Sequence, residues 1–123
     1  MSGEPGVALV PLGSPRGRSA WTIRYGGRSY SVFASGGDFL VSDARCPHQG
    51  GPLADGLVRD GVVTCPWHWY SFDLRTGRCT SAAAYRLRTY PVVSQDGRLY
   101  AELPRRRRSR FWPQLRRVRS PGR

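Results

Sequence analysis

The sequence has no lysine, few acidic residues, only two histidines and no long apolar stretch. All 20 basic residues are arginines against 8 acidic residues, so the formal net charge of +12 partly reflects a coding bias rather than a selected basic surface. No segment approaches the ~20 apolar residues that span a bilayer. Residues 1–20 lack the positive cluster and apolar stretch of a secretory signal. We therefore expect a soluble, cytoplasmic protein.

Cysteine is also scarce. Three cysteines, an odd number, argue against a disulfide framework. They favour metal ligation plus one free thiol in a reducing compartment. At 123 residues the chain has the size of one domain, with room for a modest hydrophobic core.

Helical periodicity is missing too, and short stretches rich in β-branched and aromatic residues alternate with turn signals. This pattern predicts an all-β protein. Paired turn residues predict tight turns that connect successive strands. The expected strands are residues 20–25 and 28–34 around Gly26-Gly27, 39–43 after Gly36-Gly37, 57–59 and 62–64 around Asp60-Gly61, and 87–93 and 98–103 around Asp96-Gly97. Pro91 cannot donate to a strand ladder, which places its strand at an edge or a bulge.

Two connections are long for so compact a domain, residues 44–56 and residues 65–85. Long ordered loops are usually functional. We expect residues 1–104 to form the domain. Residues 105–123 contain nine arginines and no acid, so they predict a disordered, arginine-rich tail.

Each long loop carries one cysteine and one histidine: Cys46-Pro47-His48 in the first, Cys65-Pro66-Trp67-His68 in the second. Cysteines can pack as small apolar residues and histidines can lie on the surface, but both histidines here fall within three residues of a cysteine, which indicates a metal site. In the common zinc finger a cysteine pair precedes a histidine pair, whereas here the two types alternate. Alternation suits a 2Fe-2S cluster whose one iron takes two thiolates and whose other iron takes two imidazoles. Four-ligand zinc stays an alternative.

The motifs resemble those of the Rieske family, whose loops read C-x-H and C-x-x-H. The resemblance extends through residues 48–53, 65–73 and 76–77, and the strand pattern of residues 7–103 is similar to the family's antiparallel domain. It implies a β-sandwich or barrel with a cluster-binding loop subdomain and one 2Fe-2S cluster. Cys46 and Cys65 would then bind the buried iron, and His48 and His68 the outer iron that is reduced.

Glycines beside the first ligand pair have a physical use in this picture. Without a Cβ, Gly50 and Gly51 would let backbone N–H groups approach the sulfides and donate hydrogen bonds. As an alternative, they serve only as turn formers.

The chain departs from the high-potential Rieske proteins of respiratory complexes. Gly51 and Trp67 occupy the positions of that branch's extra disulfide cysteines, and Tyr70 and Phe72 occupy those of its hydroxyl donors to cluster sulfur. Phe72 has no hydroxyl, so the potential should lie toward the low end of the ~−150 to +300 mV Rieske range.

The pattern instead resembles Rieske ferredoxins that feed bacterial oxygenases, and the small subunit of NAD(P)H-dependent nitrite reductase. Trp69 stands where ferredoxins usually have a glycine, which favours the nitrite reductase small subunit. Residues 81–84, in the position of the family's third loop, read Ser-Ala-Ala-Ala, so the cover over the cluster should be loose. Cys79 matches no ligand position, and we expect it to be a semi-buried thiol.

No histidine remains for the mononuclear iron of a terminal oxygenase or for a general base, and no glycine-rich phosphate loop is present. The sequence therefore predicts an electron carrier without a catalytic site beyond the cluster. It would pass single electrons from a flavin reductase to an oxygenase or, alternatively, serve with a nitrite reductase large subunit. A zinc-stabilised nucleic-acid-binding module is the remote alternative. The tail, if not merely solvated, could dock on an acidic partner.

Overall fold

The computed structural model describes residues 6–14, 17–48, 50–67, 69–81 and 84–105. They form ten strands and one short 3-10 helix, η1. In chain order the elements are β1 (Val7–Pro11), β2 (Ala20–Tyr25), β3 (Arg28–Ser35), β4 (Asp38–Asp43), η1 (Leu53–Asp55), β5 (Leu57–Arg59), β6 (Val62–Thr64), β7 (Ser71–Asp73), β8 (Thr89–Tyr90), β9 (Val92–Gln95) and β10 (Arg98–Pro104). Within these residues no helix has the length and apolar character needed to cross a bilayer.

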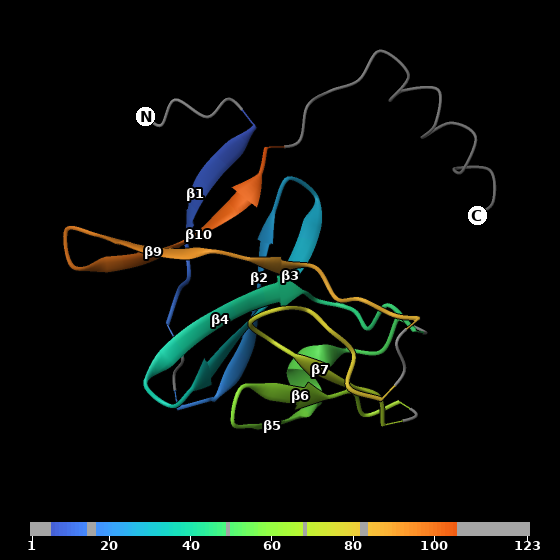
Figure 1. Ribbon diagram of the computed structural model, residues 1–123. Coiled ribbons are helices and arrows are strands. Elements are labelled where there is room, and N and C mark those ends of the chain that lie inside the picture. Colours follow the sequence, from blue (N-terminus) through green and yellow to red (C-terminus); the bar gives the residue numbers. More distant parts are fainter. Residues whose placement is uncertain (1–5, 15–16, 49, 68, 82–83, 106–123) are drawn as a thin grey trace, which may run out of the picture.

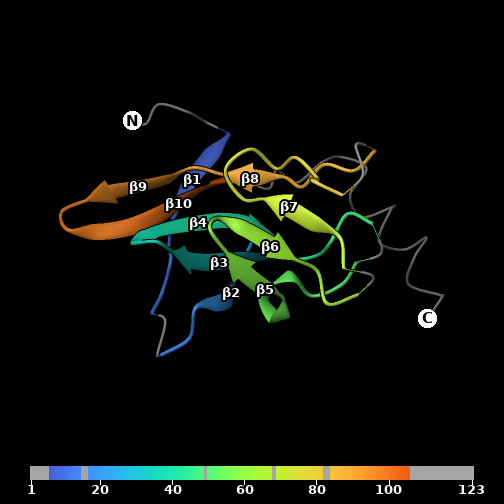
Figure 2. The same ribbon diagram turned by 60° about the horizontal axis from the view of Figure 1, so that its bottom comes forward.

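The strands form three antiparallel sheets, ordered β1-β10-β9, β2-β3-β4-β8 and β5-β6-β7. Figure 1 shows the β2-β3-β4 sheet between the other two, with the loops after β4 and after β6 meeting at one end of the molecule. The view in Figure 2 shows the same gathering of loops. The predicted all-β antiparallel fold is confirmed.

Buried side chains on both faces of β3 explain why the middle sheet packs against two apolar clusters, since successive strand residues point to opposite faces. Tyr30 and Val32 are fully buried in an apolar cluster shared with Leu103 of β10. Phe33 is fully buried in a second cluster, which also contains Cys46, Leu53, Val63, Cys65, Phe72, Leu74, Cys79 and Leu87. The second cluster therefore joins the middle sheet to the loops that carry Cys46 and Cys65, the two cysteines predicted to be ligands.

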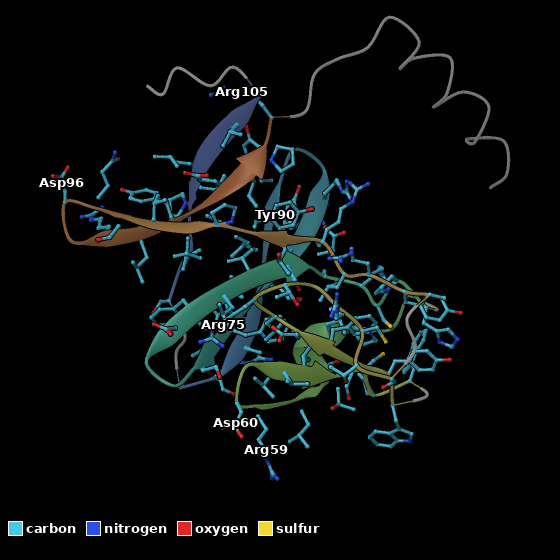
Figure 3. All side chains as sticks on the ribbon, viewed as in Figure 1. Arg59, Asp60, Arg75, Tyr90, Asp96 and Arg105 are labelled. Carbon is cyan, nitrogen blue, oxygen red and sulfur yellow. The ribbon has the colours of Figure 1, made fainter. Side chains whose placement is uncertain are left out.

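Four predicted two-residue turns are confirmed, and all have positive φ at both positions. The φ angles are 60° and 80° at Gly26-Gly27, 58° and 85° at Gly36-Gly37, 53° and 78° at Asp60-Gly61, and 53° and 77° at Asp96-Gly97. Such turns match the twist of the flanking strands, so they fix the register of each hairpin. Figure 3 labels Asp60 and Asp96 at the tips of the β5–β6 and β9–β10 hairpins.

The predicted strand over residues 87–93 is wrong as a single strand. It is interrupted at Pro91 into β8, which pairs with β4, and β9, which pairs with β10. Both are edge strands, as the proline predicted. The carbonyl oxygen of Pro91 still accepts a hydrogen bond from the Glu102 N–H at 2.9 Å, so the missing donor sets where the chain changes sheets.

A second difference lies in the long loop over residues 65–85. Ser71–Asp73 forms β7, whose Phe72 faces Val63 on β6. Three residues are too few to show alternation, and a serine and an aspartate flank the buried phenylalanine. The strand is therefore stabilised by the burial of Phe72 rather than by its own sequence pattern.

Candidate metal centre

The first cysteine loop closes on itself through backbone hydrogen bonds. The Cys46 N–H donates to the Gly51 carbonyl oxygen at 2.8 Å, and the Gly50 N–H donates to the Cys46 carbonyl oxygen at 2.7 Å. Gly50 has a φ of 79°, which a glycine adopts without strain. The Gly50 N–H therefore closes the turn, which is the alternative role that the sequence offered for this glycine, while donation of backbone N–H groups to cluster sulfides stays a prediction.

The second cysteine loop closes in the same way. The Cys65 N–H donates to the Tyr70 carbonyl oxygen at 2.7 Å, again five residues later in the chain. The Trp67 N–H points at the Cys65 Sγ, 3.4 Å away. His68, the fourth predicted ligand, lies outside the described residues. Each cysteine therefore begins a short loop closed by a backbone hydrogen bond, and in the sequence its predicted histidine falls between the two residues that this bond joins.

The end of the second loop contains an unusual backbone conformation. Trp69 has a φ of 61°, in the left-handed region. That region costs a residue with a Cβ roughly 1–2 kcal/mol. Asp60 and Asp96 also adopt it, but aspartate tolerates left-handed turns and a bulky aromatic residue does so rarely.

The two loops touch at Gly51. A Cβ added there would lie 2.7 Å from the Cys65 Sγ and 3.0 Å from the Trp67 Cγ. Glycine is therefore required because the second loop lies against the first. Gly51 and Trp67 are also the positions that carry extra cysteines in high-potential Rieske proteins, so here an aromatic ring against a glycine occupies the place of that link.

The cysteine thiols lie next to each other in a buried setting, with Cys46 3% exposed and Cys65 fully buried. Burial raises the pKa of Cys65; the Trp67 N–H opposes this, and the neighbouring Cys46 thiol adds to it. A bare Cys65 thiolate is thus disfavoured, whereas a bound metal ion supplies positive charge that deprotonates a coordinating thiol. No disulfide joins Cys46, Cys65 and Cys79, and buried Cys79 lies opposite Phe72.

His48 is held between two tyrosines that sequence reasoning missed. Its ring stacks on Tyr70 from the second loop, with centroids 4.1 Å apart and planes at 9°. The edge of Tyr85 approaches the same ring at 5.0 Å, and the two tyrosines also contact each other. The sequence does not predict which aromatic rings contact His48, because these contacts join segments that are distant along the chain.

The described donors fit one half of a two-iron cluster. The structure brings Cys46 and Cys65 together, as an iron with two thiolates requires. Among the described residues, which leave out His68, no three cysteine, histidine or acidic side chains form a group that could hold a metal ion.

A cleft of about 560 Å³ lies elsewhere, along β4 and β8, and contributes nothing to this centre. An ion pair between Arg75 and Asp38, 3.2 Å apart, lies at its rim. Nearby, the Tyr90 hydroxyl donates to the Asp43 Oδ1 at 2.6 Å. Burial and this hydrogen bond raise the pKa of Tyr90. Figure 3 labels Arg75 and Tyr90 in this part of the molecule.

An all-β domain with two matched Cys/His loops defines a class of metal-cluster proteins. Residues 12–91 match the Rieske [2Fe-2S] domain, and the chain belongs to that family. The predicted cofactor, one Rieske-type 2Fe-2S cluster, and the predicted role in electron transfer are confirmed. Which residues bind the cluster stays a prediction.

Similar proteins are ferredoxins and related small subunits. The 3-phenylpropionate/cinnamic acid dioxygenase ferredoxin subunit of Photorhabdus laumondii is 40% identical over 72 residues, which cover 57% of this chain and 69% of the relative. The ferredoxin of Sphingomonas yanoikuyae B1 superimposes with a TM-score of 0.66 at 26% identity, covering 80% of this chain and 99% of that one. A protein assigned as the NADH-dependent nitrite reductase small subunit of Mycobacterium tuberculosis has a TM-score of 0.62 at 20% identity over 69% of this chain and 82% of its own, so it shares the fold.

Proposed function

We propose that this chain is the ferredoxin component of an oxygenase system. In each event it takes one electron from the reduced flavin of a reductase and gives one electron to an oxygenase, so two events use the electron pair of one NAD(P)H. The observation that carries the proposal is the convergence of two self-closed cysteine loops at one end of the domain, with both thiols buried side by side. The dioxygenase ferredoxin subunits among its relatives support this choice of partner.

Four residues would hold the cluster. Cys46 and Cys65 would bind one iron, while His48 and His68 would bind the other, which changes between ferric and ferrous states. Stacking on Tyr70 fixes the ring plane of His48 and thereby the direction of its ring nitrogens. Burial of the cysteines keeps water from the thiolate side, so electrons would enter and leave on the histidine side.

The proposal is tested by reconstitution with purified protein components. The full chain is mixed with NADH and the reductase and oxygenase of a 3-phenylpropionate dioxygenase system, and product formation is measured with and without it. We expect product only when the chain is present, together with a rhombic EPR signal on reduction. No coupling here, but coupling to a nitrite reductase large subunit, would establish the alternative. A colourless protein that contains zinc would refute both.

Two finer proposals follow from the same role. A cytoplasmic location is supported by the odd number of cysteines and by the spacing of Cys46 and Cys65 to histidines, which favour thiol ligands in a reducing compartment. The arginine-rich tail, residues 105–123, would speed docking on an acidic partner; residues 106–123 lie outside the described part of the chain. Because the Arg105 N–H donates to the Gly6 carbonyl oxygen at 2.7 Å, truncation after Arg105 is the suitable variant. It should slow partner reduction at low salt only, and equal rates across a salt series would refute tail docking.

A further inference from the structure

Two exposed tryptophans lie in the second cysteine loop. Among the described residues, the exposed large apolar side chains are Leu9 (41%), Leu57 (63%), Trp67 (48%) and Trp69 (70%). The two tryptophans come directly before and directly after His68. Two indoles within three residues, one half-exposed and one mostly exposed, offer an apolar patch, which in soluble proteins marks an interaction site.

The two tryptophans differ in what they do for the fold. The ring of Trp67 packs against Gly51 beside the Cys65 thiol, so part of it is structural. Trp69 leaves 70% of its surface in solvent and holds a left-handed backbone, with a φ of 61°. Glycine would adopt this conformation without strain. The indole of Trp69 therefore carries a conformational cost that its own burial does not offset, which indicates a contact outside the chain.

Charge around this patch indicates what kind of surface it meets. Arg45 is exposed at the base of the first loop, and its Nη1 donates to the Gly50 carbonyl oxygen at 3.0 Å. An apolar centre with a basic rim is complementary to a surface with an apolar centre and an acidic rim.

We propose that Trp69, with the exposed part of Trp67, is the apolar centre of the docking surface for the redox-partner protein, and that Arg45 meets an acidic group on its rim. The inference rests on the proposed function, because an electron carrier must place its partner near the outer iron. Aromatic residues often dominate such interfaces, since a flat ring buries a large area with few rotatable bonds.

The test separates docking from folding and from cluster assembly. Trp69→Gly removes the indole and relieves the backbone, while Trp69→Phe keeps an aromatic ring at the same φ. Leu9→Ser, on β1 in another sheet, is the matched loss of an exposed apolar side chain. All variants are assayed as full chains for visible spectrum, unfolding midpoint, reduction by dithionite and reduction by the purified 3-phenylpropionate dioxygenase reductase.

We expect Trp69→Gly to keep the spectrum, the dithionite rate and at least the wild-type unfolding midpoint. Its reduction by the reductase should need about tenfold more protein for half-maximal rate, which corresponds to about 1.4 kcal/mol of lost binding. Trp69→Phe should lose less, and Leu9→Ser nothing. Equal behaviour of Trp69→Gly and wild type toward the reductase would overturn the docking surface. A wild-type chain that dithionite reduces but no protein component does would instead refute the proposed function, and the inference with it.

Discussion

A methyl group added at Gly51 should push the two cysteine loops apart. The Cβ of Gly51→Ala would lie 2.7 Å from the Cys65 Sγ and 3.0 to 3.1 Å from the Trp67 ring. The tryptophan is half-exposed and its ring can tilt outward, but Cys65 is fully buried and cannot yield in the same way. Overpacking of this kind costs about 1–3 kcal/mol. Because cluster binding is coupled to folding, displacement of a ligand thiol should also reduce the occupancy of the cluster.

The neighbouring glycine provides the control. A Cβ on Gly50 would meet only the Arg45 Cδ, at 4.0 Å, so Gly50→Ala creates no close contact. It does place a Cβ at a φ of 79°, which costs about 1 kcal/mol. A loss of this size lowers the unfolding midpoint of a domain of about 100 residues by about 4–8 °C.

Three measurements compare the pair: iron per polypeptide, the visible spectrum, and the unfolding midpoint of the cluster-loaded protein. Gly51→Ala should lose iron as well as stability, whereas Gly50→Ala should lose stability and keep its iron. A Gly51→Ala variant with full iron content and a wild-type spectrum would refute the close approach of the loops. Iron loss in Gly50→Ala alone would instead mean that the first turn, and not the contact between loops, governs assembly.

Further substitutions test the ligands, the potential and one hydrogen bond. Cys46→Ser should abolish the rhombic EPR signal of the reduced protein, whereas Cys79→Ser should keep it; a signal that survives the first change would refute the ligand set. Phe72→Tyr, in the same buried cluster as the ligand cysteines, should raise the reduction potential in protein-film voltammetry if its hydroxyl reaches a cysteine sulfur, and no positive shift would mean that it does not. The folded state raises the pKa of Tyr90, so its contribution to the free energy of unfolding should be complete below the unfolded pKa of about 10 and should decrease above it. The decrease should be less than about 1.4 kcal/mol per pH unit, because solvent screens a half-buried group. Denaturant unfolding from pH 9 to 11 should show this slope in wild type but not in Tyr90→Phe, and equal slopes would contradict it.

Turn chemistry made most of the fold predictable from sequence. Glycine pairs and Asp-Gly pairs adopt positive φ at low cost, so residues such as Asp60 and Gly61 set the strand ends on both sides. The predicted ends of the β5–β6 hairpin agree with the structure to the residue. Short elements whose stability comes from distant partners were not predictable in this way. β7 depends on Phe72 meeting Val63, and β8 depends on a pairing with β4, nearly fifty residues earlier in the chain.

The candidate centre likewise has features that the sequence predicts and features that it does not. Ligand spacing predicts Cys46, His48, Cys65 and His68 as the ligands, because coordination demands particular side chains at short separations. The stacking of His48 on Tyr70 could not be predicted, since it depends on how two loops meet in space.

The contact between Gly51 and Trp67 shows what a comparison of residue types leaves out. In the sequence these positions read as the loss of two cysteines, and therefore as the loss of a link between the loops. In the structure a ring packs on the face of a glycine at the same place, with the Cys65 thiol beside both. A covalent link and a packed ring restrain the loops differently. The half-exposed Trp67 ring can move away from Gly51 with the loss of van der Waals contact only, whereas a disulfide would have to break. The loops of this protein should therefore be easier to open for cluster insertion than disulfide-linked loops, and Gly51 is the residue whose substitution would show it.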